Sequence, residues 1–175
     1  LDGAALAQLD AVVTGVRAAN TRPELATAMP VLLDFVASGG TLVMQYNTER
    51  GLDMARFAPF PLKLSRNRVT DEAAPVRFLL PEHPVLSEPN RLTDADFAGW
   101  IQERGLYFAE EWDPAYAAPL GMHDPGENEL TGSLLVARHG RGRYVYTGLA
   151  FFRQLPAGNP GAIRLFLNLL GTGRS

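Results

Sequence analysis

The stretch Gly39-Gly-Thr-Leu-Val-Met-Gln-Tyr-Asn47 decides how this chain is interpreted. Residues 41–44 form an unbroken β-forming run between a glycine pair and three polar residues. Such a run favours a strand that is buried on both faces of a parallel sheet. The polar end, Gln45-Tyr46-Asn47, then lies at the carboxyl edge, where open α/β sheets bind ligands. The stretch therefore predicts an α/β fold and the position of a candidate site.

The preceding residues complete a strand–helix–strand unit. Residues 11–16 predict a strand, and Thr21 and Glu24 have the spacing of a capping box at the start of a helix. That helix ends at Gly39, and its apolar face is predicted to carry Leu25, Met29, Leu32 and Val36. A right-handed crossover makes the two strands parallel, so their carboxyl ends share one edge.

The remainder of the chain predicts short elements and a final helix. Residues 62–65 and 76–80 are candidate strands, and a short helix is expected from Thr93 through Trp100. Residues 134–138 and 143–149 predict a hairpin, because the short segment His139-Gly-Arg-Gly142, which contains two glycines, joins them. Asn159-Pro160 opens the last helix, whose docking face is expected to be Ile163, Phe166, Leu167 and Leu170. We expect a single domain over residues 1–175.

Composition excludes several classes of function. The formal net charge is −3, which disfavours a general nucleic-acid partner or an anionic membrane surface. The absence of cysteine excludes disulfides, thiolate catalysis and cysteine metal sites. No stretch has the length of a membrane span, and no signal peptide is visible. The sequence does not distinguish a cytoplasmic from an exported protein.

A group of aromatic residues has two interpretations. It could line a sugar-binding surface, or it could pack beneath a long loop, which is the commoner arrangement. The group consists of Trp100, Tyr107, Phe108, Trp112 and Tyr116.

No motif specifies a reaction. The three histidines, His83, His123 and His139, are far apart and lack a metal-binding spacing. His123, Asp124 and Glu127 form the densest group of ionisable side chains, within a segment whose Pro-Gly pair marks a turn. Neither a nucleophile elbow nor a dinucleotide or phosphate loop occurs. We therefore expect neither a cofactor nor a metal.

The carboxyl edge of the sheet is the remaining candidate site. Its arginines suit anionic or hydroxyl-rich ligands, and its amides supply paired donors and acceptors. The alternative is that these groups cap helix ends and satisfy loop backbone. The predicted ligand-binding residues are Arg17, Asn20, Arg22, Gln45, Tyr46, Asn47 and Arg153.

Several stretches together resemble the class I glutamine amidotransferase-like fold, and more narrowly the domain behind the deacetylase domain of bacterial PIG-L (LmbE-like) proteins. The resemblance rests on residues 10–20, 39–47, 83–86, 96–108 and 140–152. It implies a flavodoxin-like parallel sheet flanked by helices, with a β-hairpin extension near the C-terminus. It also implies a bacterial protein and a further strand and helix before Leu1, as in a fragment of a longer polypeptide.

The chain departs from both families at their catalytic motifs. An active amidotransferase carries cysteine where Gln45-Tyr46-Asn47 stands, and the zinc motif of the deacetylases, Ala-His-Pro-Asp-Asp-Glu, is absent. The resemblance therefore implies a non-catalytic accessory domain of an N-acetylsugar deacetylase. Its partners would be a saccharide or small polar ligand and the deacetylase domain of the same polypeptide.

Two alternatives remain open at this point. One is an independent metal-assisted hydrolase that uses His123, Asp124 and Glu127. The other is a purely structural domain that forms homo-oligomers by burying Phe151 and Phe152 against another subunit.

Overall fold

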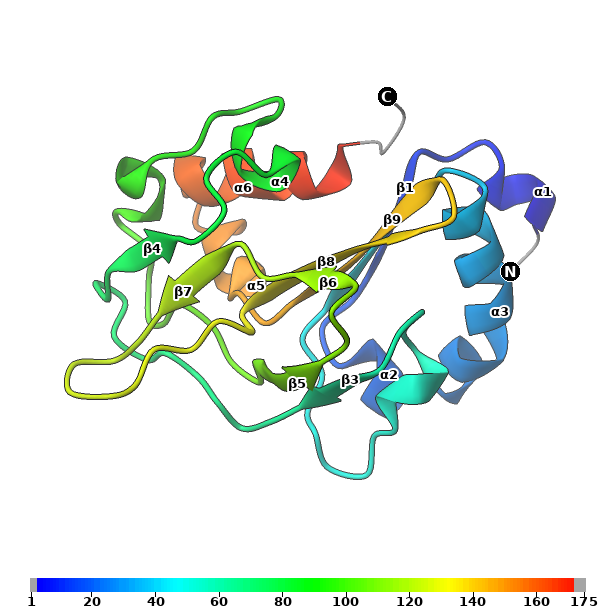
Figure 1. Cartoon of the computed structure of the whole chain (residues 1–175), viewed down its shortest axis with the longest axis horizontal. Helices are drawn as coiled ribbons and strands as arrows, with labels where there is room; N and C mark the ends of the chain where they lie inside the picture. Colours follow the sequence, from blue (N-terminus) through cyan, green and yellow to red (C-terminus); the bar gives the residue numbers. More distant parts are fainter. Residues whose placement is uncertain (1–2, 172–175) are drawn as a thin grey trace.

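The computed structural model describes residues 3–171 of the chain, and these residues fold around a mixed five-stranded sheet (Figure 1). In spatial order the strands are β1 (Ala11–Thr14), β2 (Thr41–Gln45), β9 (Gly142–Thr147), β8 (Leu134–His139) and β6 (Tyr116–Ala117). Strands β1, β2 and β9 are parallel, β8 is antiparallel to β9, and β6 is antiparallel to β8.

Two antiparallel ribbons and several helices complete the fold. The ribbons pair β3 (Leu62–Leu64) with β5 (Ala109–Trp112), and β4 (Val76–Phe78) with β7 (Leu120–Met122). The helices are α1 (Gly3–Leu6), α2 (Ala18–Thr21), α3 (Pro23–Ala37), α4 (Pro84–Ser87), α5 (Phe151–Gln154) and α6 (Pro160–Leu170), with 3-10 helices η1 (Met54–Arg56) and η2 (Asp94–Phe97).

The sheet is covered on both faces, by α3 on one side and by α6 on the other (Figure 1). Successive residues of β2 contribute to opposite cores, because side chains alternate along a strand. Val43 joins the core with α6, whereas Leu42 and Met44 join the core with α3. All three are fully buried, so β2 is the doubly covered strand that its sequence predicts.

The predicted strand–helix–strand unit is confirmed. β1 pairs in parallel with β2, and Thr14 lies opposite Met44 in the register. The two carboxyl ends therefore meet at one edge of the sheet.

The predicted hairpin exists, but it is not an extension of the sheet. β9 lies between β2 and β8, so the hairpin supplies the centre of the sheet and makes it mixed. The apolar run in β9 explains this position, because Tyr144, Val145 and Tyr146 are fully buried. A solvent-exposed hairpin would leave half of these side chains in water.

Two predictions about helices are wrong. Thr21 does not cap α3: its hydroxyl donates to the Arg17 carbonyl as part of α2, and Pro23 begins α3 directly. The predicted docking face of α6 is right for Phe166 and Leu170, which pack against the core, but wrong for Ile163 and Leu167, which are 39% and 49% exposed. The buried residues of α6 are Gly161, Ala162, Leu165, Asn168 and Leu169.

Two other helices begin at the residues that the sequence predicts. Thr93 and Asp96 form the capping box of η2, which ends at Phe97 rather than at Trp100. The Asn159 side chain accepts a hydrogen bond from the Ala162 backbone N–H, and Pro160 occupies the first turn of α6.

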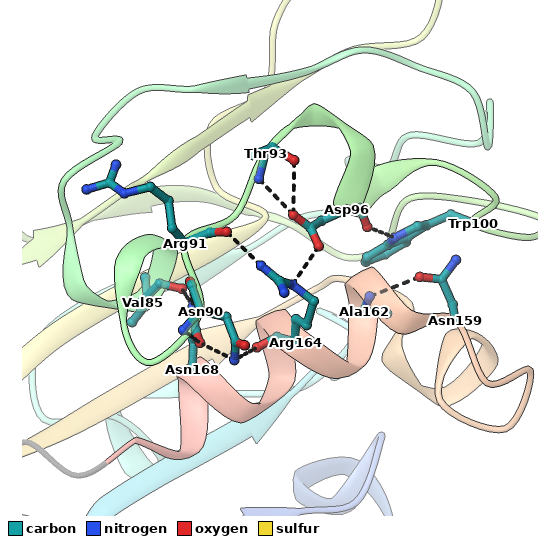
Figure 2. A network of polar contacts seen from close by, with 10 residues as sticks. All are labelled: Val85, Asn90, Arg91, Thr93, Asp96, Trp100, Asn159, Ala162, Arg164 and Asn168. Carbon is teal, nitrogen blue, oxygen red and sulfur yellow. Dashed lines mark hydrogen bonds and ion pairs between the residues drawn. The ribbon is translucent and has the colours of Figure 1, made fainter.

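A buried polar network fastens the segment between α4 and η2 to α6 (Figure 2). The Asn168 amide oxygen accepts from the Asn90 backbone N–H at 3.0 Å and from its side-chain amide, also at 3.0 Å. The Asn168 amide nitrogen donates to the carbonyls of Val85 and Asn90. One turn nearer the start of α6, Arg164 forms an ion pair with Asp96 at 2.9 Å. One helix thereby fixes a long segment that has little regular structure.

None of the helices within residues 3–171 combines the length and apolar character that a bilayer crossing requires.

Candidate functional site

Three predicted site residues use their amides to join two loops at the carboxyl edge. Asn47 is fully buried; its oxygen accepts from the Ala19 backbone N–H at 2.9 Å. The Asn20 side chain accepts a hydrogen bond from the Thr48 N–H and donates one to the Thr48 carbonyl. The Gln45 amide donates to the Thr14 carbonyl at 3.0 Å. These amides tie the end of β1 and α2 to the end of β2 and the residues after it. The three amides hydrogen-bond to backbone groups, which is the scaffold role given above as the alternative to ligand binding.

This role predicts a stability effect for Asn47→Ala. The substitution removes a fully buried amide and leaves the half-buried Ala19 N–H without its partner, so the free energy of unfolding should fall by about 1–3 kcal/mol. Urea denaturation measures the change, with Arg22→Ala, an exposed neighbour, as the control expected to stay within about 0.5 kcal/mol. Equal stabilities for the two variants would contradict the loop-tying role.

An aromatic cluster occupies the same junction. The Tyr46 ring stacks on Tyr107 with centroids 5.6 Å apart and tilts against Phe152 at 5.3 Å. Tyr46 is only 9% exposed, whereas Tyr107 and Phe152 are half-buried. The Tyr146 hydroxyl donates to the Tyr107 carbonyl at 2.7 Å and holds that residue in place. The half-buried rings leave apolar surface at the carboxyl edge.

Charged groups surround this cluster. Glu103 is 8% exposed and pairs with Arg153 at 2.6 Å, and the Arg153 guanidinium lies 4.8 Å from the centroid of Phe152. Burial raises the pKa of Tyr46 above its usual value, partly opposed by the positive charge of Arg17. Tyr46 therefore remains a neutral phenol at pH 7, able to donate and accept hydrogen bonds but unable to act as an anionic nucleophile.

Two residues beside Tyr46 adopt left-handed backbone conformations. Arg17 has φ 57° and Tyr107 has φ 53°, values that are uncommon for residues other than glycine. The Arg17 N–H donates to the Tyr46 carbonyl at 2.8 Å. Such conformations cost free energy and often occur at functional sites.

The structure brings together most, but not all, of the predicted site. Arg17 and Arg153 lie close enough to Tyr46 to affect its pKa, and Gln45 and Asn47 are its neighbours in the chain. Arg22 lies apart, on a groove lined by β1 and α3. Glu103, Tyr107 and Phe152 also belong to the site but were not predicted there, because they come from segments without a strand–loop signature.

The aromatic group found in the sequence divides between core and surface. Trp100, Phe108 and Tyr116 are between 0% and 5% exposed, as core packing requires. Tyr107 belongs to the edge cluster, and Trp112 lines an open groove of about 490 Å³ together with Phe60 and Lys63. The five aromatic residues therefore do not form one continuous sugar-binding surface.

The carboxylate of Asp124, in the group His123, Asp124 and Glu127, is engaged with a neighbouring loop. The Asp124 carboxylate accepts hydrogen bonds from the Thr70 N–H and hydroxyl and from the Asp71 N–H, so its oxygens hold a loop. These hydrogen bonds, opposed by partial burial, lower its pKa. Within the described part of the chain, no three His, Asp or Glu side chains gather as metal ligands.

Phe151 does not offer an assembly surface. It is fully buried between Trp100 and Phe166 in the core beside α6. Only Phe152 of this pair reaches the surface, where it belongs to the edge cluster.

Comparisons with known proteins identify the fold but not the family. Neither a protein-family model nor a curated protein sequence matches the chain. Among solved structures, the cytoplasmic protein STM3548 from Salmonella typhimurium superposes with a TM-score of 0.62 at 15% identity, over 97% of this chain and 73% of that one. The cytoplasmic protein STM1381 from Salmonella typhimurium LT2 gives 0.62 and 15%, over 96% and 73%. The likeness is one of fold.

Proposed function

We propose that this chain is a non-catalytic ligand-binding module that takes a saccharide at the carboxyl edge of β2. The observation that carries the proposal is the cluster of Tyr46, Tyr107 and Phe152 with the Arg153–Glu103 pair at its rim. Aromatic faces beside hydrogen-bonding groups suit sugars, because the rings cover C–H surfaces while polar groups meet hydroxyls.

The chemistry of this edge favours binding over turnover. The end of β2 and the two residues after it place an amide, a phenol and a second amide where an enzyme of this architecture would need a nucleophile. Both amides are engaged with backbone, and the phenol is neutral at pH 7. The groups around Tyr46 therefore serve to orient a ligand rather than to attack it.

The resemblance of the sequence supplies the ligand class and the partner. A domain that accompanies an N-acetylsugar deacetylase would bind N-acetylated sugars and pack against the deacetylase domain. The outer edge of β1 is one surface for such packing, since β1 ends the sheet and Val13 is 38% exposed.

Calorimetric titration with a chito-oligosaccharide tests the proposal. Tyr107→Ala removes a half-buried ring of the cluster and should weaken binding about tenfold. Trp112→Ala is the matched control, because it removes an aromatic ring from a different groove and should leave the affinity unchanged.

The same samples separate binding from catalysis. We expect the chain to release no acetate from the oligosaccharide, with or without added Zn²⁺. Loss of binding in Trp112→Ala with retention in Tyr107→Ala would move the site to the other groove. Acetate release that requires His123 would support the metal-assisted hydrolase instead.

A further inference from the structure

A second cavity lies at the far end of β9 from Tyr46. It has a volume of about 370 Å³, within the range of small-molecule sites, and it lies between the start of α4 and strands β6, β8 and β9. Arg143, near the amino end of β9, lines it. It therefore lies at the opposite edge of the sheet from the saccharide site.

Positive charge dominates the lining. Arg138, Arg141 and Arg143 contribute guanidinium groups, whereas Glu88 is the one carboxylate among the described lining residues. Within residues 3–171 none of the three arginines forms an ion pair with a carboxylate. Three positive charges and one negative charge leave an excess of two positive charges.

Arg143 is the group that most needs a partner. Its side chain is half-buried, and its Nε atom is buried without a hydrogen-bond partner. Buried donors in proteins are almost always paired, and an unpaired charge away from water is costly. An oxyanion in the cavity would offset the positive charge of this guanidinium. Arg141 is already partly engaged, since it donates to the Ser38 carbonyl at 3.0 Å.

The remaining wall is apolar. Pro84, Ala117 and Val136 face the cavity along with Ala115 and Ala137. We propose that the cavity binds a small organic phosphate monoester, with the phosphate on Arg143 and Arg138 and the organic part on this apolar wall. A phosphate monoester carries nearly two negative charges at pH 7 and suits the planar guanidinium fork, so it matches the charge excess.

His83 provides an internal reporter of the bound anion. Its Nδ1 accepts from the Val85 backbone N–H at 3.3 Å, so the neutral ring carries its proton on Nε2. Burial, and next the charge of Arg143, lower its pKa below the usual 6.5. An anion on Arg143 would offset that charge and raise the pKa of His83.

The experiment uses the whole chain with phenyl phosphate, inorganic phosphate and benzoate as probes. Calorimetry should show phenyl phosphate binding more tightly than inorganic phosphate, because only the former covers the apolar wall, and more tightly than the monoanion benzoate. NMR titration of His83 should show its pKa rising on addition of phenyl phosphate. Arg143→Gln should weaken binding about tenfold or more and abolish the His83 response.

Two further variants make the result decisive. Arg91→Gln removes a surface arginine that pairs with Glu82, and its affinity should equal that of the parent chain. Arg138→Gln changes an exposed lining residue, and it should weaken binding even if Arg143→Gln failed to fold. Equal affinity of the Arg138 and Arg91 variants, or an unchanged His83 pKa, would overturn the proposal.

Discussion

Gly161→Ala should destabilise the protein although alanine is the better helix former. A Cβ atom at this position would lie 1.8 Å from the Asp96 carbonyl oxygen and 2.4 Å from the carbonyl carbon, both of which belong to backbone. Helix propensity alone favours alanine by about 1 kcal/mol. The clash cannot be relieved by a side-chain rotation, so we expect a net loss of about 2 kcal/mol or more in the free energy of unfolding.

Urea denaturation of Gly161→Ala and Gly15→Ala measures this effect. Gly15 is the control, because a Cβ there would meet no atom within 4 Å. A more stable Gly161→Ala would show that the first turn of α6 does not lie against η2.

Asn168→Ala should cost about 3 kcal/mol of unfolding free energy. The side chain is fully buried and makes four hydrogen bonds, two with the amide oxygen and two with the amide nitrogen. Alanine leaves the matching groups of Asn90 and Val85 without partners, and unsatisfied buried groups carry most of the penalty. The segment before η2 would then keep only its polar contacts with Arg164 of α6 (Figure 2).

Leu167→Ala is the matched control on the same helix. Leu167 is 49% exposed and should cost less than about 1 kcal/mol, although its sequence spacing placed it on the docking face. If Leu167→Ala proved the more damaging change, α6 would pack by the face that the sequence predicts.

The α6 helix shows why a spacing rule found the element but not its orientation. Ile163, Phe166, Leu167 and Leu170 satisfy helical spacing, but so do Ala162, Leu165 and Leu169 with Asn168. The second set is buried because Asn168 finds partners in a segment about 80 residues earlier in the chain, which a local pattern does not reveal. Tertiary contacts therefore selected the buried face.

The central strand was predictable for the opposite reason. Residues 41–44 have no polar side that could face water apart from Thr41, so only a position covered on both faces accommodates them. The place of β9 was not predictable from its hairpin turn. The turn fixes the pairing of β9 with β8. The pairing of β9 with β2 depends on residues about 100 positions earlier in the chain.

The candidate site was predictable only in part. The junction of two parallel strands follows from the crossover rule, so Arg17, Tyr46 and the amides were expected at one edge. Tyr107 and Phe152 come from the segments that close over this edge, and no regular spacing links them to β2. The amides hydrogen-bond to backbone groups, whereas the rings of the aromatic cluster provide the surface proposed for a ligand.

Chemical-shift mapping with a chito-oligosaccharide tests the saccharide-binding edge most directly. The proposal predicts the largest shifts at the backbone amides of Tyr46, Tyr107 and Phe152, with the Trp112 indole N–H unmoved and the oligosaccharide recovered intact. Shifts confined to Trp112, or none at saturating ligand, would contradict it.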